Sequence, residues 1–260
     1  MSVFRFKRFE VRNELSAMKV NTDGVILGAA TPVSGNESRV LDIGTGTGTI
    51  ALMLAQRISD RSAINLSKNS CDDEPKNLKI IGIDIDYDAA VEASANFLNS
   101  PWNNFLEAKH LPLSGLKDDS IEQYDIIISN PPYYDSSLTN PDVRKTIARH
   151  TDGLSYREIL DFAENHLSPR GIVSLILPAD QEMQLLRYGR MRGLKCDRLL
   201  RIRTTARKNP SRIVTVFSLA SSQASTNGKT STIEEELTIM EKGKYTFQYI
   251  SLIKDFYTFA

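Results

Sequence analysis

Residues 39–57 read RVLDIGTGTGTIALMLAQR, and this stretch decides the fold of the 260-residue chain. The segment from Val40 to Ile43 has the short apolar character of a buried strand, and a helix is expected from about Thr49. Three glycines alternate with threonines between them: Gly44, Gly46 and Gly48. Glycines at a strand-to-helix turn let the backbone approach a ligand closely. The sequence therefore predicts an α/β fold with a ligand-binding turn.

The spacing of the glycines distinguishes two classes of nucleotide-binding turn. It differs from the Gly-x-Gly-x-x-Gly pattern of dinucleotide-binding folds, which packs on a pyrophosphate. It resembles the Asp-x-Gly-x-Gly-x-Gly loop of S-adenosylmethionine-dependent methyltransferases, whose cofactor has no pyrophosphate. That resemblance implies a cofactor-binding loop made of Asp42, Gly44, Thr45, Gly46 and Gly48.

The next strand is expected over residues 78–84, LKIIGID. Asp84 at its end lies at the expected distance beyond the glycine loop, where an acid accepts both ribose hydroxyls of a nucleoside. Capping of the following helix is the alternative role for Asp84, although Asp86 is the better candidate for that cap. Ile85 is expected to flank the adenine of the cofactor. Residues 104–111 indicate a third strand, but no acid follows it to bind the adenine amino group.

Residues 125–134, DIIISNPPYY, carry the candidate catalytic groups. Prolines cannot donate to a sheet ladder, so the apolar strand stops before them and leaves a stiff loop at its carboxyl end. The side-chain oxygen of Asn130 and the main-chain oxygen of Pro131 could accept the two N–H bonds of a planar amine and so free its lone pair. Tyr133 could stack on the ring, and Pro132 is a further candidate for contact with the substrate. An ordinary Pro-rich turn is the alternative.

Two basic segments are candidates for binding a polyanion. The polar loop after the Pro-rich segment contains Arg144, Lys145 and Arg149, and it is either a phosphate-binding loop or a solvated lid. Residues 198–212 contain six basic residues with no acid between them, and Arg207, Lys208 and Arg212 are the candidates there for contact with RNA. A solvated basic hairpin is the alternative for the second segment.

Composition limits the remaining possibilities. The 32 basic and 32 acidic residues balance, so any anion-binding surface must be local. The two cysteines lack metal-ligand spacing and favour a reducing compartment. No signal peptide or membrane span is expected, which predicts a cytoplasmic protein. We expect one domain over residues 1–260, with an exposed insertion at 59–77, a flexible loop at 221–232 and a C-terminal tail docked on the body.

Three features together resemble one family: the DIGTGTG loop, the acid at position 84 and the Asn-Pro-Pro-Tyr loop. The segments MKVNTDGVILGAA, KNPSRIVTVFSL and YTFQYISLIKDFY are similar to those of the bacterial tRNA (adenine-N6)-methyltransferases that modify the adenosine beside the anticodon of valine tRNA. The resemblance implies a doubly wound, seven-stranded class I methyltransferase (Rossmann-like) sheet, mostly parallel with an antiparallel terminal strand. It implies S-adenosyl-L-methionine as cofactor and tRNA as partner, with neither a metal nor an obligate protein partner.

Two other functions stay open at this point. Release-factor methyltransferases also carry Asn-Pro-Pro-Tyr and methylate a glutamine amide, whose nitrogen poses the same lone-pair problem. They usually have an extra helical domain before the glycine loop, and only about forty residues precede it here. An RNA-binding protein that keeps a nucleoside pocket without turnover is the third possibility.

Overall fold

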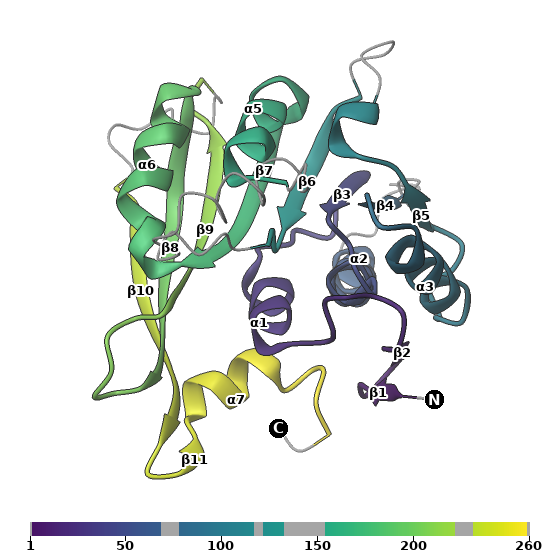
Figure 1. Cartoon of the computed structure of the whole chain (residues 1–260), viewed down its shortest axis with the longest axis horizontal. Coiled ribbons are helices and arrows are strands. Elements are labelled where there is room, and N and C mark those ends of the chain that lie inside the picture. The colour runs from purple at the N-terminus through teal and green to yellow at the C-terminus, as the bar shows by residue number, and fades with distance from the viewer. Residues whose placement is uncertain (1, 69–77, 117–121, 133–153, 222–230, 259–260) are drawn as a thin grey trace, which may run out of the picture.

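The computed structural model describes residues 2–68, 78–116, 122–132, 154–221 and 231–258. A short N-terminal hairpin consists of β1 (Val3–Arg5) and β2 (Glu10–Arg12). The alternation of apolar and basic residues over positions 3–11 is typical of an edge strand or a hairpin, and the structure has the hairpin. The strands of the main sheet are β3 (Arg39–Ile43), β4 (Lys79–Asp84), β5 (Leu106–His110), β6 (Tyr124–Ser129), β7 (Leu167–Pro178), β8 (Leu194–Thr205), β9 (Arg212–Leu219), β10 (Ile233–Glu241) and β11 (Lys244–Tyr245). Their order across the sheet is β11-β10-β8-β9-β7-β6-β3-β4-β5 (Figure 1).

The expected seven-stranded sheet is present, but it is extended at one edge. From β5 to β7 the strands are parallel, and β9 runs antiparallel to both of its neighbours, β7 and β8. The expectation of seven strands is wrong in number, because β10 pairs in parallel with β8 and β11 pairs with β10. Residues 233–241, IEEELTIME, were not expected as a strand, since consecutive glutamates are unusual in one.

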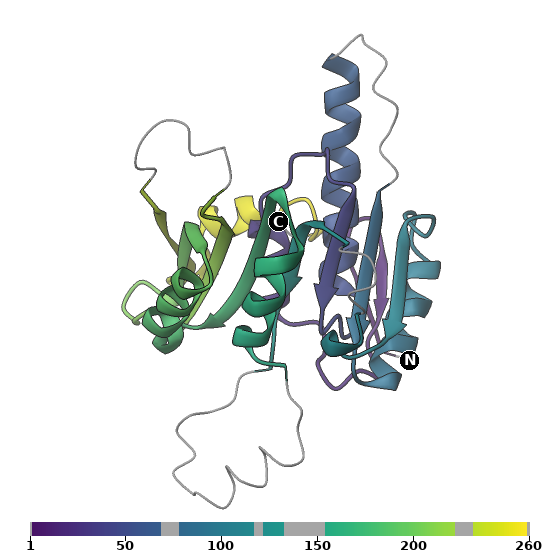
Figure 2. The same cartoon turned by 90° about the horizontal axis from the view of Figure 1, so that it is seen from above.

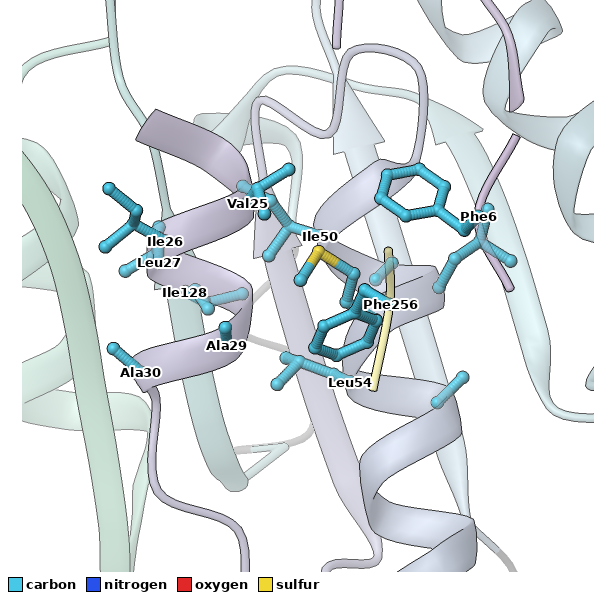
Figure 3. Close-up of a cluster of buried hydrophobic side chains, with 14 of the residues drawn as sticks. Phe6, Val25, Ile26, Leu27, Ala29, Ala30, Ile50, Leu54, Ile128 and Phe256 are labelled. Carbon is cyan, nitrogen blue, oxygen red and sulfur yellow. The ribbon is translucent and has the colours of Figure 1, made fainter. Parts of the chain in front are cut away.

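Helices cover both faces of this sheet. The helices are α1 (Thr22–Ala30), α2 (Thr49–Lys68), α3 (Tyr87–Leu98), α5 (Tyr156–His166), α6 (Glu182–Met191) and α7 (Phe247–Ile253). One hydrophobic cluster joins α1, α2, α3 and α7 to the sheet, and a second joins α5 and α6 to it. Figure 3 shows Val25 of α1, Ile50 of α2 and Ile128 of β6 in the first cluster. None of the described helices is long and apolar enough to cross a membrane.

The two ends of the chain also meet in this first cluster. Phe6 and Phe256 lie in it with 5% and 1% of their surfaces exposed (Figure 3). The Lys7 amide donates to the Phe256 carbonyl at 2.8 Å. The predicted docking of the C-terminal tail on the body is therefore confirmed.

The interpretation of residues 59–77 as a loop is wrong over its first half. Helix α2 continues to Lys68 and projects past the sheet, as Figure 2 shows. No glycine or proline lies between positions 49 and 68, so each residue adds one hydrogen bond to a helix that is already nucleated. Arg8 holds Asp60 with two contacts of 2.6 and 2.7 Å. Residues 69–77, and 222–230 of the expected loop at 221–232, lie outside the described residues.

Two local expectations also need correction. The position of Asp23 just before the apolar run Val25 to Leu27 predicts that it caps a helix, but Asn21 caps α1, because its side chain accepts from the Gly24 amide at 2.8 Å. Pro169 and Gly171 predict a break in the chain, yet β7 runs through them. A Cβ on Gly171 would lie 2.5 Å from the Tyr124 carbonyl oxygen, so glycine permits the close strand approach there. The cap expected from Asp86 is confirmed, since it accepts from the Asp88 amide.

Strand register brings the candidate residues to one edge of the sheet. Ile43 at the end of β3 pairs with Ile83 on one side and with Ser129 on the other. The three strands therefore end level with one another, and the chain leaves them at Gly44, Asp84 and Asn130. Ligands bind at the carboxyl ends of the strands in open α/β sheets.

Candidate active site

The glycine turn is tied to the end of β4 by backbone hydrogen bonds. The amides of Gly44 and Thr45 both donate to the Ile83 carbonyl at 2.9 Å. The Gly46 amide donates to Asp84 Oδ2 at 2.8 Å. Asp84, the last residue of β4, therefore also fixes the position of the glycine turn.

The three glycines share a backbone conformation but not an environment. Gly44, Gly46 and Gly48 have φ values of 70°, 56° and 78°, in the region that favours glycine. A Cβ on Gly44 would meet only Leu154 Cδ2, at 3.6 Å, whereas a Cβ on Gly48 would lie 2.4 Å from Phe97 Cε1. Gly44 thus faces open space at the site, and Gly48 packs against α3 on the inner side.

Asp42 is completely buried beneath this turn. Thr45 Oγ1 donates to its Oδ2 at 2.7 Å, so the threonine hydroxyl points inward rather than toward a ligand. Asp42 Oδ1 has no hydrogen-bond partner of normal geometry among the described residues. Burial, together with the negative charge of Asp84, raises the pKa of Asp42 to about 7, although the bond from Thr45 opposes this. A backbone hydrogen bond from Ala51 also opposes the rise in pKa. Asp42 does not line the cavity, so its predicted contact with a cofactor stays a prediction.

Asp84 and Ile85 lie beside each other at the site. Asp84 is partly exposed and accepts from the Gly46 and Asp86 amides, one on each oxygen. Each carboxylate oxygen has capacity for a second hydrogen bond, so two hydroxyl donors can still bind. The Ile85 side chain is 57% exposed, which leaves an apolar surface next to that carboxylate.

Asn130 lies on the same cavity as the glycine turn. Its residue surface is 6% exposed, and its Nδ2 lies 3.6 Å from Met18 Sδ. Pro131 is buried and Pro132 is exposed. Tyr133 lies outside the described residues, so its predicted stacking role stays a prediction.

A cavity of about 930 Å³ joins these groups. Its size is at the upper end of the range for small-molecule sites. Its lining includes the ends of β4 and β5, as Ile83 to Asp86 and Leu111 to Ser114. The other lining residues include Ser16, Ala17, Met18, Gly44, Gly46, Asn130, Pro132 and Leu154.

Sequence reasoning missed the contribution of residues 13–19, which we call the 13–19 loop. Ser16, Ala17 and Met18 line the cavity next to Gly46. Ser16 Oγ lies 3.4 Å from the position that a Cβ on Gly46 would take. The motif MKVNTDGVILGAA begins inside this loop, so the signal was present, but its polar residues were interpreted as a helix start.

The end of β5 provides a second contribution that the sequence left unassigned. Leu111, Pro112, Leu113 and Ser114 line the cavity where an acid was expected. His110 Nε2 donates to the Ile85 carbonyl at 3.0 Å, and the His110 ring meets Tyr87 edge-on at 5.4 Å. His110 therefore supports the neighbouring strand end. Within the described part of the chain, no cluster of His, Cys, Asp or Glu could hold a metal ion.

Most of the predicted basic patch at 198–212 is neutralised by acids from other elements. Arg198 pairs with Glu235, Arg201 with Glu182 and Glu234, and Arg203 with Glu236. Arg212 Nε lies 2.7 Å from Asp23 Oδ2. Four of the six cations therefore already have carboxylate partners, and the role predicted for Arg212 in RNA contact stays a prediction.

Arg207 and Lys208 differ from these four residues. Both are exposed on the turn between β8 and β9, and neither forms an ion pair with a residue that the structure describes. Arg212 pairs with Pro178 at the carboxyl end of β7, so this turn leaves the sheet at the same edge as the cavity. Arg144, Lys145 and Arg149 lie outside the described residues.

Comparison with known proteins agrees with this geometry. Residues 35–205 match the family model described as the RMKL-like methyltransferase domain. A predicted O-methyltransferase of Agrobacterium tumefaciens superimposes with a TM-score of 0.60 at 15% identity, over 90% of this chain and 96% of that one. The fold and the site thus define a class I methyltransferase.

Relatives of nearly the same length give the particular family. A protein of Bacteroides fragilis is 37% identical over 98% of this chain and 97% of its own length. A protein of Photobacterium profundum is 36% identical with the same coverage. Both are named tRNA1(Val) (adenine(37)-N6)-methyltransferase, and the chain belongs to this family.

Proposed function

We propose that this protein transfers the methyl group of S-adenosyl-L-methionine to the N6 amine of an adenine in tRNA. By the names of its relatives, the tRNA is tRNA1(Val) and the nucleotide is adenosine 37. The observation that carries the proposal is the placement of Asn130, Asp84 and the open face of Gly44 on one cavity.

The residues present fit the cofactor. Gly44 leaves room where any other residue would place a side chain. Asp84 has two acceptor positions for ribose hydroxyls, and Ile85 offers an apolar surface for the adenine. When bound, S-adenosylmethionine supplies an electrophilic methyl group.

The chain's own contribution to the reaction is alignment. An exocyclic amine is a poor nucleophile because its lone pair is conjugated with the ring. Asn130 Oδ1 and the Pro131 carbonyl accept its two N–H bonds and direct the lone pair out of the ring plane. The amine proton released on methylation passes to solvent. The assignment of Asn130 rests on its place after β6 and on the cavity that it lines, and that of Pro131 rests on its place next to Asn130.

The exposed cations at the carboxyl end of the central strands are the residues that would contact tRNA. The target base must leave its stack to enter the cavity, so the phosphates around it must be held outside. Arg207 and Lys208 form no ion pair within the described part of the chain, and they lie at the correct edge of the sheet. We propose the same role for Arg144, Lys145 and Arg149, with Tyr133 and Pro132 against the target base.

The test is methylation of unmodified tRNA1(Val) with labelled cofactor, followed by nucleoside mass spectrometry. We expect N6-methyladenosine with the wild type and at least about a hundredfold lower rate with Asn130→Ala, as for other oxyanion-type donors and acceptors. Cofactor affinity should survive this change, which calorimetry would show. A fully active Asn130→Ala protein would contradict the alignment mechanism.

The same assay separates the remaining functions. Release factor methylated in place of tRNA would favour the glutamine-amide alternative. Tight RNA binding without methylated product would favour a non-catalytic role. The family membership supports the adenine amine over both.

A further inference from the structure

The 13–19 loop forms one wall of the cavity although almost no apolar burial holds it there. Leu15 is 54% exposed and Met18 is 38% exposed. Only Ser16 among these seven residues is buried. Hydrophobic packing stabilises in proportion to the apolar surface removed from water, so this loop gains little from it. Its position must depend on polar contacts.

Those contacts converge on one buried carboxylate in α3. Glu92 is 3% exposed. Its Oε1 accepts from the amides of Glu14 at 2.6 Å and Leu15 at 2.9 Å, and its Oε2 accepts from the Ser16 amide at 2.9 Å. Three consecutive backbone N–H groups of the loop thus bind one carboxylate.

Asn96, one turn further along α3, connects the same region to the glycine turn. It accepts from the Arg12 amide at 2.8 Å and donates to the Arg12 carbonyl at 3.0 Å. It also donates to the Thr47 carbonyl at 2.9 Å. One helix face therefore holds the start of the loop and the glycine turn at a fixed separation.

The other hydrogen bonds of the loop are internal, or reach residues next to it in sequence, the N-terminal Ser2, or Asn130 through a weak 3.6 Å contact with Met18 Sδ. Asn13 Oδ1 accepts from Val20, Ser16 Oγ donates to Met18, and Lys19 Nζ donates to the Glu14 carbonyl. Bonds to a charged acceptor are worth about 1.5–3 kcal/mol each, more than neutral ones. Glu92 is consequently the strongest link between the loop and the body of the protein.

We infer that Glu92 is a positioning residue for the cofactor pocket. It does not touch the cavity, but it holds Ser16 and Met18 in place beside Gly46 and Asn130. Without Glu92 the loop becomes mobile, and the entropy lost when the cofactor orders the loop weakens cofactor binding. This inference rests on the proposed function only in taking S-adenosylmethionine as the ligand.

The test compares Glu92→Gln with Asp88→Asn, which makes the same charge change at an exposed position of α3. In glutamine an NH2 group replaces one carboxylate oxygen and cannot accept a hydrogen bond from a backbone N–H of the loop. At least one of the three hydrogen bonds is therefore lost. We expect the Kd for S-adenosylmethionine, measured by calorimetry, to rise about tenfold or more in Glu92→Gln and to be unchanged in Asp88→Asn. The KM for the cofactor should rise with little change in kcat.

Hydrogen exchange on the cofactor-free protein gives an independent readout. The amides of residues 14–16 should exchange faster in Glu92→Gln, while the amides of β3 and β6 stay protected. If circular dichroism shows that Glu92→Gln does not fold, Glu92→Asp replaces it, since it keeps the charge but shortens the reach. We expect an intermediate Kd from Glu92→Asp.

The outcomes separate this inference from the proposed function. A wild-type protein that does not bind S-adenosylmethionine would overturn the proposed function. A wild-type protein that binds it, with wild-type affinity and exchange in both Glu92 variants, would overturn the positioning role alone. An equal loss of cofactor affinity in Glu92→Gln and Asp88→Asn would also overturn the positioning role, because the loss would then follow from the change in net charge alone.

Discussion

Gly44 and Gly48 have nearly the same backbone conformation, and replacing each by alanine should have different consequences. At either position the left-handed conformation costs an L-residue about 1–2 kcal/mol. At Gly48 the new methyl carbon would also lie 2.4 Å from a ring carbon of Phe97, which is only 2% exposed and cannot move freely. Overpacking of this kind lowers the free energy of unfolding by about a further 1–3 kcal/mol.

The expected loss of stability is therefore about 2–5 kcal/mol for Gly48→Ala and about 1–2 kcal/mol for Gly44→Ala. At about 2–4 °C per kcal/mol for a chain of this size, the melting temperature falls by about 4–20 °C in the first variant and about 2–8 °C in the second. Differential scanning calorimetry of the cofactor-free proteins measures both.

For cofactor affinity the order is reversed, and Gly44→Ala should be the variant that binds more weakly. Gly44 lines the cavity, so its new methyl group occupies space that a ligand needs, whereas Gly48 does not line it. We expect Gly44→Ala to raise the Kd for S-adenosylmethionine about tenfold, and folded Gly48→Ala protein to bind nearly normally. Equal stability in the two variants, or weaker binding by Gly48→Ala than by Gly44→Ala, would refute this reasoning.

Two further predictions concern charge. The pKa of Asp42 is about 7 in the folded protein, above its usual value, so the folded state holds a proton that the unfolded chain releases. The stability of the cofactor-free protein should therefore fall as pH rises from about 4 to about 7. In melting curves Asp42→Asn should remove this pH dependence, and a variant with the same pH dependence as the wild type would contradict the assignment. Charge reversal at Arg207 and Lys208 should weaken tRNA binding and reduce its salt slope by about 1–2. Arg203→Gln should leave the slope unchanged because Glu236 already neutralises that arginine, and equal changes in all variants would exclude a specific role for the β8–β9 turn.

Local sequence patterns predicted the elements around the site well. The glycine turn, the acid at the end of β4 and the Pro-rich end of β6 each depend on the chemistry of a few adjacent residues. Alternating apolar runs mark buried strands, and Asp86 caps α3 as its position indicates. These features carry their own signal, so they could be placed before any contact was known.

Interactions between distant segments could not be predicted in the same way. No acid lies between the arginines of β8 in sequence, and Asp197, which precedes them, pairs with Lys195. The glutamates of β10 nevertheless lie beside these arginines in the sheet. For the same reason residues 233–241 were not recognised as a strand. Their glutamates are stable there because they face cations contributed by a neighbouring strand.

The sequence alone determined the fold class, the nucleoside-binding turn and the chemistry of the Pro-rich loop, because each is written in contiguous residues. Only the tertiary structure decided which arginines of β8 and β9 are paired with carboxylates and what holds the 13–19 loop beside Gly46. Both depend on partners far apart in the chain: Glu92 is 76 positions from Ser16. Such pairings arise from packing and strand order, which no local pattern encodes.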